Sequence, residues 1–111
     1  MTEKRCLRGT DLRYVLTHYL QAHGPMTIAQ LTSMLEQDGF ETAGRASKAI
    51  SDALRWEVRR GRVGHGRRGR YGPGWMPRST EHRIRKRVLA LRGEAQRLAA
   101  GSGHVSVVPT S

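Results

Sequence analysis

Residues 49–74 read AISDALRWEVRRGRVGHGRRGRYGPG, and the pattern of this stretch changes at Gly61. Before Gly61, apolar residues recur at helical spacing, which predicts a helix that begins near Arg45 and ends before Gly61. From Gly61 onward six of fourteen residues are glycine, and a glycine inside a helix costs about 1 kcal/mol relative to alanine. The stretch therefore predicts a helix followed directly by a glycine-rich element that is not helical.

The predicted helix has an apolar side and a charged side. At about 100° per residue, one broad arc collects its apolar side chains, which are Ala46, Ala49, Ile50, Ala53, Leu54, Trp56 and Val58. The opposite arc carries Arg45, Lys48, Ser51, Asp52, Arg55 and Arg59. We expect the first arc to pack on a core, with Trp56 inside it or against the final segment, and the second arc to face solvent as a cationic strip.

The glycine-rich element is predicted to be a β-hairpin. Val63 and Tyr71 are its only strongly β-prone residues, and they lie symmetrically about the turn at residues 66–69. Pro73 suits the end or the edge of a strand. A disordered Gly/Arg loop of the kind that coats RNA is the alternative left open. Just beyond the hairpin, Trp75 is expected to pack beneath it rather than stack on a base.

Two more helices are predicted upstream. Residues 1–9 are polar and are expected to be flexible. From Thr10, apolar residues follow the helical template until the Gly24-Pro25 pair ends the pattern. Thr27 and Gln30 then form the sequence signature of a capping box, which predicts the start of a second helix. That helix is expected to run to about Gln37, after which Phe40 returns to the core.

A last helix is predicted over residues 80–100. Its apolar positions form a heptad-like seam of Ile84, Val88, Leu91, Ala95 and Leu98. The seam is short for an independent coiled coil. It is expected to cover its own domain or to pair with a second copy of the chain, so a homodimer through this helix is one of the predictions. Residues 101–111 are expected to be a flexible tail.

The chain has 111 residues and a formal net charge of +11 at pH 7, from 20 Lys and Arg against 9 Asp and Glu. That length suits one domain. No apolar run approaches the ~18 residues of a membrane helix, and the N-terminus lacks the apolar region of a signal peptide. The single cysteine, Cys6, fits a reducing cytoplasm. Such a charge predicts an anionic partner, with nucleic acid as the default and a membrane surface as the alternative.

The charge is distributed unevenly. Residues 1–44 hold four cations and five anions, whereas residues 45–97 hold sixteen cations and four anions, a net of +12. The last fourteen residues carry no charged side chain. This asymmetry is typical of a nucleic-acid-binding face that begins at the predicted helix near Arg45 and continues through the hairpin and the last helix.

Catalytic chemistry finds little support in the sequence. The histidines lie scattered, at His18, His23, His65, His82 and His104, with no metal-ligand spacing near a carboxylate or Cys6. The glycine run lacks the Lys-Ser/Thr of a phosphate-binding loop, and no Gly-x-Ser-x-Gly occurs. We therefore expect no enzymatic activity, no metal and no cofactor.

A resemblance to a known family rests on residues 49–63 (AISDALRWEVRRGRV) and 69–71 (GRY). They resemble the recognition helix and the wing of bacterial winged helix-turn-helix DNA-binding domains. The resemblance implies a mainly α fold with a small β-hairpin, in which the third helix reads the major groove and the hairpin is the wing. A winged helix-turn-helix domain is accordingly expected at residues 10–77, followed by a basic C-terminal helix at residues 78–100.

The resemblance also implies contact residues. Carried over by position, the recognition residues are Arg45, Ser47, Lys48, Ser51, Asp52 and Arg55. The wing contacts are Arg62, His65, Arg67, Arg68 and Arg70. Additional phosphate contacts are expected from Arg59, Arg60, Arg83 and Lys86. Asp52 has an alternative role, since it could pair with Lys48 or Arg55 on the same helix.

The expected function is binding of double-stranded DNA in the nucleoid, with a large sequence-independent component and no membrane partner. The absence of an effector domain and the richness of the hairpin in Gly and Arg favour an architectural, nucleoid-associated role. A sequence-specific transcriptional regulator is the alternative within this class. A protein-interaction adaptor and an RNA-binding protein are the alternatives outside it.

Overall fold

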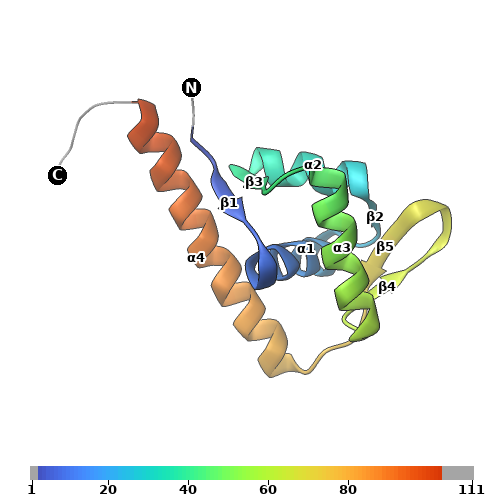
Figure 1. Ribbon diagram of the computed structural model, residues 1–111. Helices are drawn as coiled ribbons and strands as arrows, with labels where there is room; N and C mark the ends of the chain where they lie inside the picture. The colour runs from blue at the N-terminus through green and yellow to red at the C-terminus, as the bar shows by residue number, and fades with distance from the viewer. Residues whose placement is uncertain (1–2, 104–111) are drawn as a thin grey trace.

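The computed structural model describes residues 3–103, which form four α-helices and five short strands (Figure 1). Along the chain these elements are β1 (Arg5–Leu7), α1 (Gly9–His23), β2 (Met26–Thr27), α2 (Ile28–Gln37), β3 (Phe40–Thr42), α3 (Ala46–Arg59), β4 (Val63–His65), β5 (Arg70–Pro73) and α4 (Arg78–Gly103). The sequence-based expectations for residues 1–2 and 104–111 lie outside the described part. A mainly helical fold with a small sheet is confirmed.

The first two helices begin and end where the sequence predicts. Helix α1 stops at Gly24, which adopts a φ of 84° and donates its backbone N–H to the carbonyl of Leu20. The capping box of α2 is present in both directions. The Gln30 backbone N–H donates to Thr27 Oγ1 at 3.1 Å, and the Thr27 N–H donates to Gln30 Oε1 at 2.9 Å.

The predicted hairpin is present and belongs to a three-stranded antiparallel sheet in the order β2-β5-β4. Strands β4 and β5 pair Val63 with Pro73 and His65 with Tyr71. Strand β2 adds Met26 opposite Tyr71. The two residues of β2 carry no strand signal of their own, so the sequence did not predict this third strand.

Gly74 is required where the chain leaves the hairpin. Its N–H donates to the Arg62 carbonyl at 2.9 Å, and the next N–H, of Trp75, donates to the Gly61 carbonyl at 3.0 Å. A Cβ at Gly74 would lie 2.2 Å from that Gly61 oxygen, so only glycine fits this backbone approach. The contact closes the base of the hairpin against the end of α3.

The N-terminal residues differ from the sequence prediction. Instead of a flexible segment through residue 9, Arg5–Leu7 forms β1, which pairs in parallel with β3. Leu7 is fully buried, and Phe40 at the start of β3 returns to the core as predicted. Leu7 is the single apolar side chain that anchors this strand, and its three neighbours in the sequence are polar or charged. The local sequence pattern is therefore typical of a loop.

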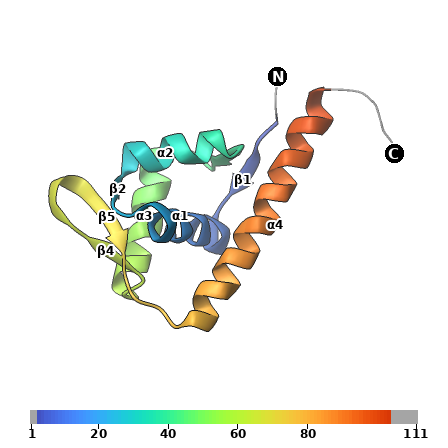
Figure 2. The same cartoon turned by 180° about the vertical axis from the view of Figure 1, so that it is seen from behind.

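Helix α4 lies across the side of the molecule opposite the hairpin, in both the view of Figure 1 and the view from behind in Figure 2. It packs against α1 and β1. Four of its seam residues are 0–2% exposed, and these are Ile84, Val88, Leu91 and Ala95. These four residues pack within the chain, whereas Leu98 is half-buried, and a homodimer through this helix stays a prediction.

Ion pairs fasten α4 at three places. On β1 and α1, Arg5 Nε donates to Glu94 at 2.7 Å, and Arg87 donates to both Asp11 oxygens at 3.0 and 3.1 Å. Arg92 contacts Asp38 at 3.2 Å, and the same carboxylate accepts the Tyr19 hydroxyl at 2.6 Å.

No helix in residues 3–103 is both long and apolar enough to cross a membrane.

Candidate nucleic-acid interface

Helix α3 carries the cationic strip that the sequence predicts. Ile50, Ala53 and Leu54 face the core, while the side chains of Lys48, Asp52 and Arg55 are 75%, 53% and 68% exposed. Arg45 is the N-cap residue of the helix and is exposed, as is Arg59 in the last turn. We call the exposed residues Arg45, Lys48, Asp52, Arg55 and Arg59 the α3 strip.

The remaining predicted recognition residues flank the α3 strip. Ser47 is exposed in the first turn, and Ser51 is half-buried. Asp52 holds the alternative role foreseen for it, because its carboxylate lies 3.0 Å from Lys48 Nζ and 3.9 Å from Arg55. The one acidic residue of the strip is therefore paired with its two cationic neighbours, and exposed helix pairs of this kind contribute about 0.3–0.5 kcal/mol.

The hairpin presents a second group of cations, at its tip. Arg67, Arg68 and Arg70 are exposed, and no carboxylate of residues 3–103 forms a salt bridge with any of them. Arg68 adopts a φ of 58°, a left-handed conformation that is rare for a residue with a Cβ. The tip is thus a tight turn that holds three guanidinium groups in solvent.

An aromatic pair stiffens the strands behind this tip. The rings of His65 and Tyr71 stack across the hairpin with centroids 4.4 Å apart and planes within 3°. A concave face of the hairpin, with a volume of about 600 Å³, is lined by His65, Arg67, Arg68 and Arg70 together with prolines and glycines. Four of the five predicted wing contacts therefore share one surface.

Arg62 is the exception among the predicted wing contacts. Its side chain turns inward, and Nε and Nη2 donate to the two carboxylate oxygens of Glu57 at 2.7 and 3.0 Å. This hydrogen bonding raises the pKa of Arg62. Because its guanidinium is hydrogen-bonded to Glu57 in the interior, we exclude Arg62 from the candidate interface.

Glu57 itself is the residue that sequence reasoning missed. It is fully buried in α3, where it also accepts the Thr17 hydroxyl at 3.3 Å and lies 3.4 Å from Arg13 Nε. A buried carboxylate is stable only when cations and donors surround it. The signal was present, since Glu57 falls on the apolar side of the helix three residues after Leu54, with an arginine five residues later.

Both tryptophans differ from their predicted positions. Trp56, expected in the core or against the final segment, is 37% exposed on the flank of α3. Trp75, expected beneath the hairpin, is 76% exposed. Its backbone N–H is held by the Gly61 carbonyl at the closed base of the hairpin, while its side chain is left largely in solvent.

The structure does not bring all predicted phosphate contacts together. Arg59, the last residue of α3, belongs to the α3 strip, and Arg60 is the C-cap residue that follows it. Arg83 and Lys86 are exposed on α4, which packs on α1 and lies away from the hairpin (Figure 1). The candidate interface therefore consists of the α3 strip, the end of α3 and the hairpin tip, without Arg83 and Lys86.

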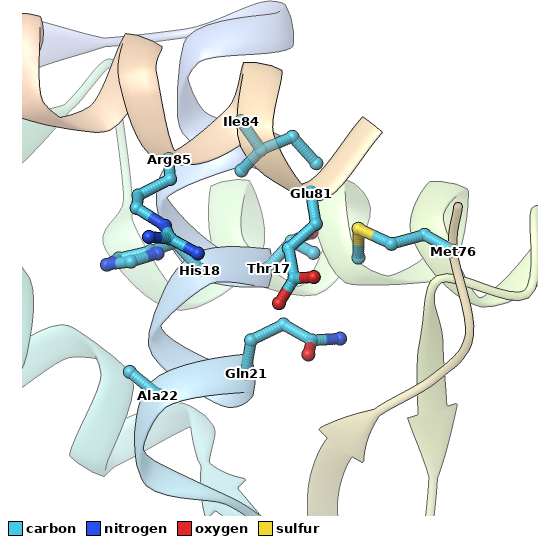
Figure 3. A pocket seen from close by; sticks show the side chains of 8 residues that line it. All are labelled: Thr17, His18, Gln21, Ala22, Met76, Glu81, Ile84 and Arg85. Atoms are coloured by element: carbon cyan, nitrogen blue, oxygen red, sulfur yellow. The ribbon is translucent and has the colours of Figure 1, made fainter. Parts of the chain in front are cut away.

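A separate cavity of about 230 Å³ lies between α1 and the start of α4 (Figure 3). Its lining includes His18, Gln21, Glu81 and Arg85, and Figure 3 shows the Arg85 guanidinium beside the His18 ring. Burial lowers the pKa of His18, and the nearby charges of Arg92 and Arg85 lower it further. Within residues 3–103, no cluster of His, Cys, Asp or Glu is arranged to hold a metal ion.

No family model, curated protein or solved structure matches this chain. The interpretation of the surface therefore rests on the residues and their geometry.

Proposed function

We propose that the protein binds double-stranded DNA through a winged helix-turn-helix domain, with α3 as the recognition helix and the β4–β5 hairpin as the wing. The observation that carries this proposal is that some arginines are paired with carboxylates and others are not. The buried or half-buried acids Asp11, Asp38, Glu57 and Glu94 pair with arginines that fasten the fold. The hairpin tip has no such partner among the described carboxylates, so its cations are free for phosphate groups.

The order of the elements supports the proposed fold. Helices α1 and α2 precede α3, and the hairpin follows α3 directly. Strand β2, between α1 and α2, completes a three-stranded sheet with the hairpin. A helix with a polar outer face fits the major groove, and a thin basic hairpin beside it fits the adjacent backbone or minor groove.

The proposed binding mode has a large sequence-independent part. Lys48, Arg55 and Arg45 of the α3 strip would face base edges and phosphates in the major groove. The hairpin tip would contact phosphates, whatever the sequence, or enter a narrow minor groove where arginine is favoured. The large share of sequence-independent contacts favours an architectural role in the nucleoid over that of a regulator with one preferred site.

The test is DNA binding measured against salt concentration, with duplexes of several unrelated sequences. If six to ten phosphates are neutralised, affinity falls roughly 10³–10⁵-fold between 50 and 200 mM salt. An architectural protein would show similar affinities and slopes for all duplexes. A shallow slope, or no binding of any duplex at low salt, would remove the DNA-binding proposal.

A further inference from the structure

Trp56 stands at the centre of a cluster of three arginines, and the proposed DNA interface gives its ring no role. Its ring lies 4.8 Å from the guanidinium carbons of Arg13 and Arg60 and 5.7 Å from that of Arg59. Among the described residues, Arg59 and Arg60 form no salt bridge, whereas Arg13 contacts the buried Glu57. Exposed tryptophan surrounded by arginine is the composition of binding hot spots in protein–protein interfaces.

A groove of about 280 Å³ runs beside this cluster, between α3 and the first turns of α1. We call it the Trp56 groove. Ala43, Ala49 and Trp56 form its accessible apolar lining, and the buried side chains of Leu7, Leu12 and Ala53 lie beneath them. The small alanines of α3 leave the space that larger side chains would fill. Apolar surface of this kind gains about 25 cal/mol for each Å² that a ligand covers.

The rim of the Trp56 groove is mostly positive. Arg8 and Arg13 line it, and Arg60 reaches the same tryptophan ring from the end of α3. The one acidic residue of the lining, Asp52, is already paired with Lys48 and Arg55. The groove therefore offers an apolar floor, and among residues 3–103 the edge cations Arg8 and Arg60 form no salt bridge.

These features favour a peptide over a nucleic-acid backbone. Phosphates need cations but gain nothing from an aliphatic floor, whereas an acidic peptide with aliphatic side chains matches both parts of the groove. We propose that the Trp56 groove binds a short acidic segment of a partner protein, with an aliphatic side chain on Ala49 and Ala53 and carboxylates beside Arg8, Arg13 and Arg60. This inference does not depend on DNA binding.

The test uses two synthetic peptides of equal length and charge, one of alternating Glu and Leu and one of alternating Glu and Ser. Each is titrated into the isotope-labelled full chain, and the amide and indole resonances are followed by NMR. The Glu/Leu peptide is expected to shift the Trp56 indole and the Ala49 and Ala53 amides, and to bind about tenfold more tightly than the Glu/Ser peptide.

Two variants and a matched control locate the site. Ala49→Glu puts a carboxylate in the wall of the groove and is expected to lower affinity for the Glu/Leu peptide about tenfold. Ala90→Glu makes the same charge change on the exposed face of α4 and is expected to leave that affinity within about twofold. Arg60→Ala is expected to weaken both peptides to a similar degree, without touching the groove floor or the core.

Three outcomes would overturn the proposal. The first is equal binding of the two peptides, which would mean attraction by charge alone. The second is a set of shifts confined to the hairpin residues 63–73. The third is displacement of the Glu/Leu peptide by a short DNA duplex that shifts the same groove resonances, which would assign the groove to nucleic acid. None of these outcomes alters the salt titration that tests DNA binding on the wild-type chain.

Discussion

Glu57 and Arg62 form a two-point ion pair that joins the last turn of α3 to the start of β4. Arg62 donates to both oxygens of a carboxylate that is fully buried, at 2.7 and 3.0 Å. A planar guanidinium and a carboxylate in this arrangement fix direction as well as distance. The pair therefore sets the angle at which the hairpin leaves α3, and with it the relative position of the α3 strip and the hairpin tip.

Glu57→Gln is expected to lower the free energy of unfolding by about 1.5–3 kcal/mol. The amide keeps the shape of the side chain but loses the charge-assisted hydrogen bonds, which contribute that much in other proteins. Urea denaturation of both proteins measures the difference. Glu36→Gln, on the exposed side of α2, is the control and should change stability by less than about 0.5 kcal/mol. Equal stabilities for wild type and Glu57→Gln would contradict a structural role for the ion pair.

The seam of α4 gives a prediction that separates self-packing from dimerisation. Leu91 is fully buried, so Leu91→Ala should cost about 2–5 kcal/mol of unfolding free energy, with a denaturation midpoint that is independent of protein concentration. Leu89, which is 58% exposed two residues earlier, is the matched control. Leu89→Ala should cost less than about 0.5 kcal/mol. A midpoint that rises with protein concentration would show that α4 also packs between chains.

The elements that the sequence predicts well have strong local signals. The capping box at Thr27, the stop at Gly24 and the change of period at Gly61 each involve residues within a few positions of one another. The strands β1 and β2 have no comparable signal. They exist because β3 and β5 supply hydrogen-bonding partners from distant parts of the chain, which a local pattern does not register.

The candidate site shows the same division. Exposure of Lys48, Arg67 and Arg68 follows from helix phase and from the position of a turn, so sequence alone predicts it. Inward rotation of Arg62 depends on the buried Glu57, and hydrophobic patterning treats a glutamate on a helix as exposed. The placement of Trp75 depends on the backbone contact between Gly74 and the residues that follow α3. The spacing of residues along the sequence does not predict such a contact.

Removal of two hairpin cations should reduce the salt dependence of DNA binding. Arg67→Ala with Arg68→Ala is expected to lower the slope of log affinity against log salt by about 1.8, since each lost phosphate contact contributes about 0.9. The loss should be similar for unrelated duplexes, because phosphate contacts do not read sequence. Fluorescence anisotropy at several salt concentrations measures it.

The matched control removes the same charge from α4. Arg83→Ala with Lys86→Ala should leave the salt slope close to that of the wild type, because α4, which carries both residues, lies on the opposite side of the molecule from the hairpin (Figure 1). A loss as large as that of the hairpin variant would extend the interface over α4 and return both residues to it. A loss confined to one duplex would instead favour a regulator.

Asp52 distinguishes attraction to phosphate from reading of a base. Asp52→Asn removes a negative charge from the α3 strip and releases Lys48 and Arg55 from their ion pairs. We expect random-sequence duplexes to bind about twofold to fivefold more tightly at low salt, in proportion to an exposed charge interaction of ~0.5–1 kcal/mol. Selective weakening for one sequence would argue the reverse, namely that the carboxylate accepts a hydrogen bond from a cytosine amino group.

His18 makes stability depend on pH. Burial, together with Arg92 and Arg85 and with a smaller opposing influence from Asp38, holds its pKa below the ordinary value of 6.5 in the folded protein. The unfolded chain then binds the proton more readily, so the contribution of neutral His18 is present above pH 6.5 and is lost as pH falls through the folded-state pKa.

Urea denaturation above and below pH 6.5 measures this effect. On acidification the free energy of unfolding is expected to fall more steeply in the wild type than in His18→Gln. In Arg85→Ala the stability lost on acidification should be smaller than in the wild type, because the substitution removes one of the cations that lower the pKa of His18. Parallel pH profiles for the wild type and both variants would mean that His18 takes up its proton equally well in the folded and the unfolded chain.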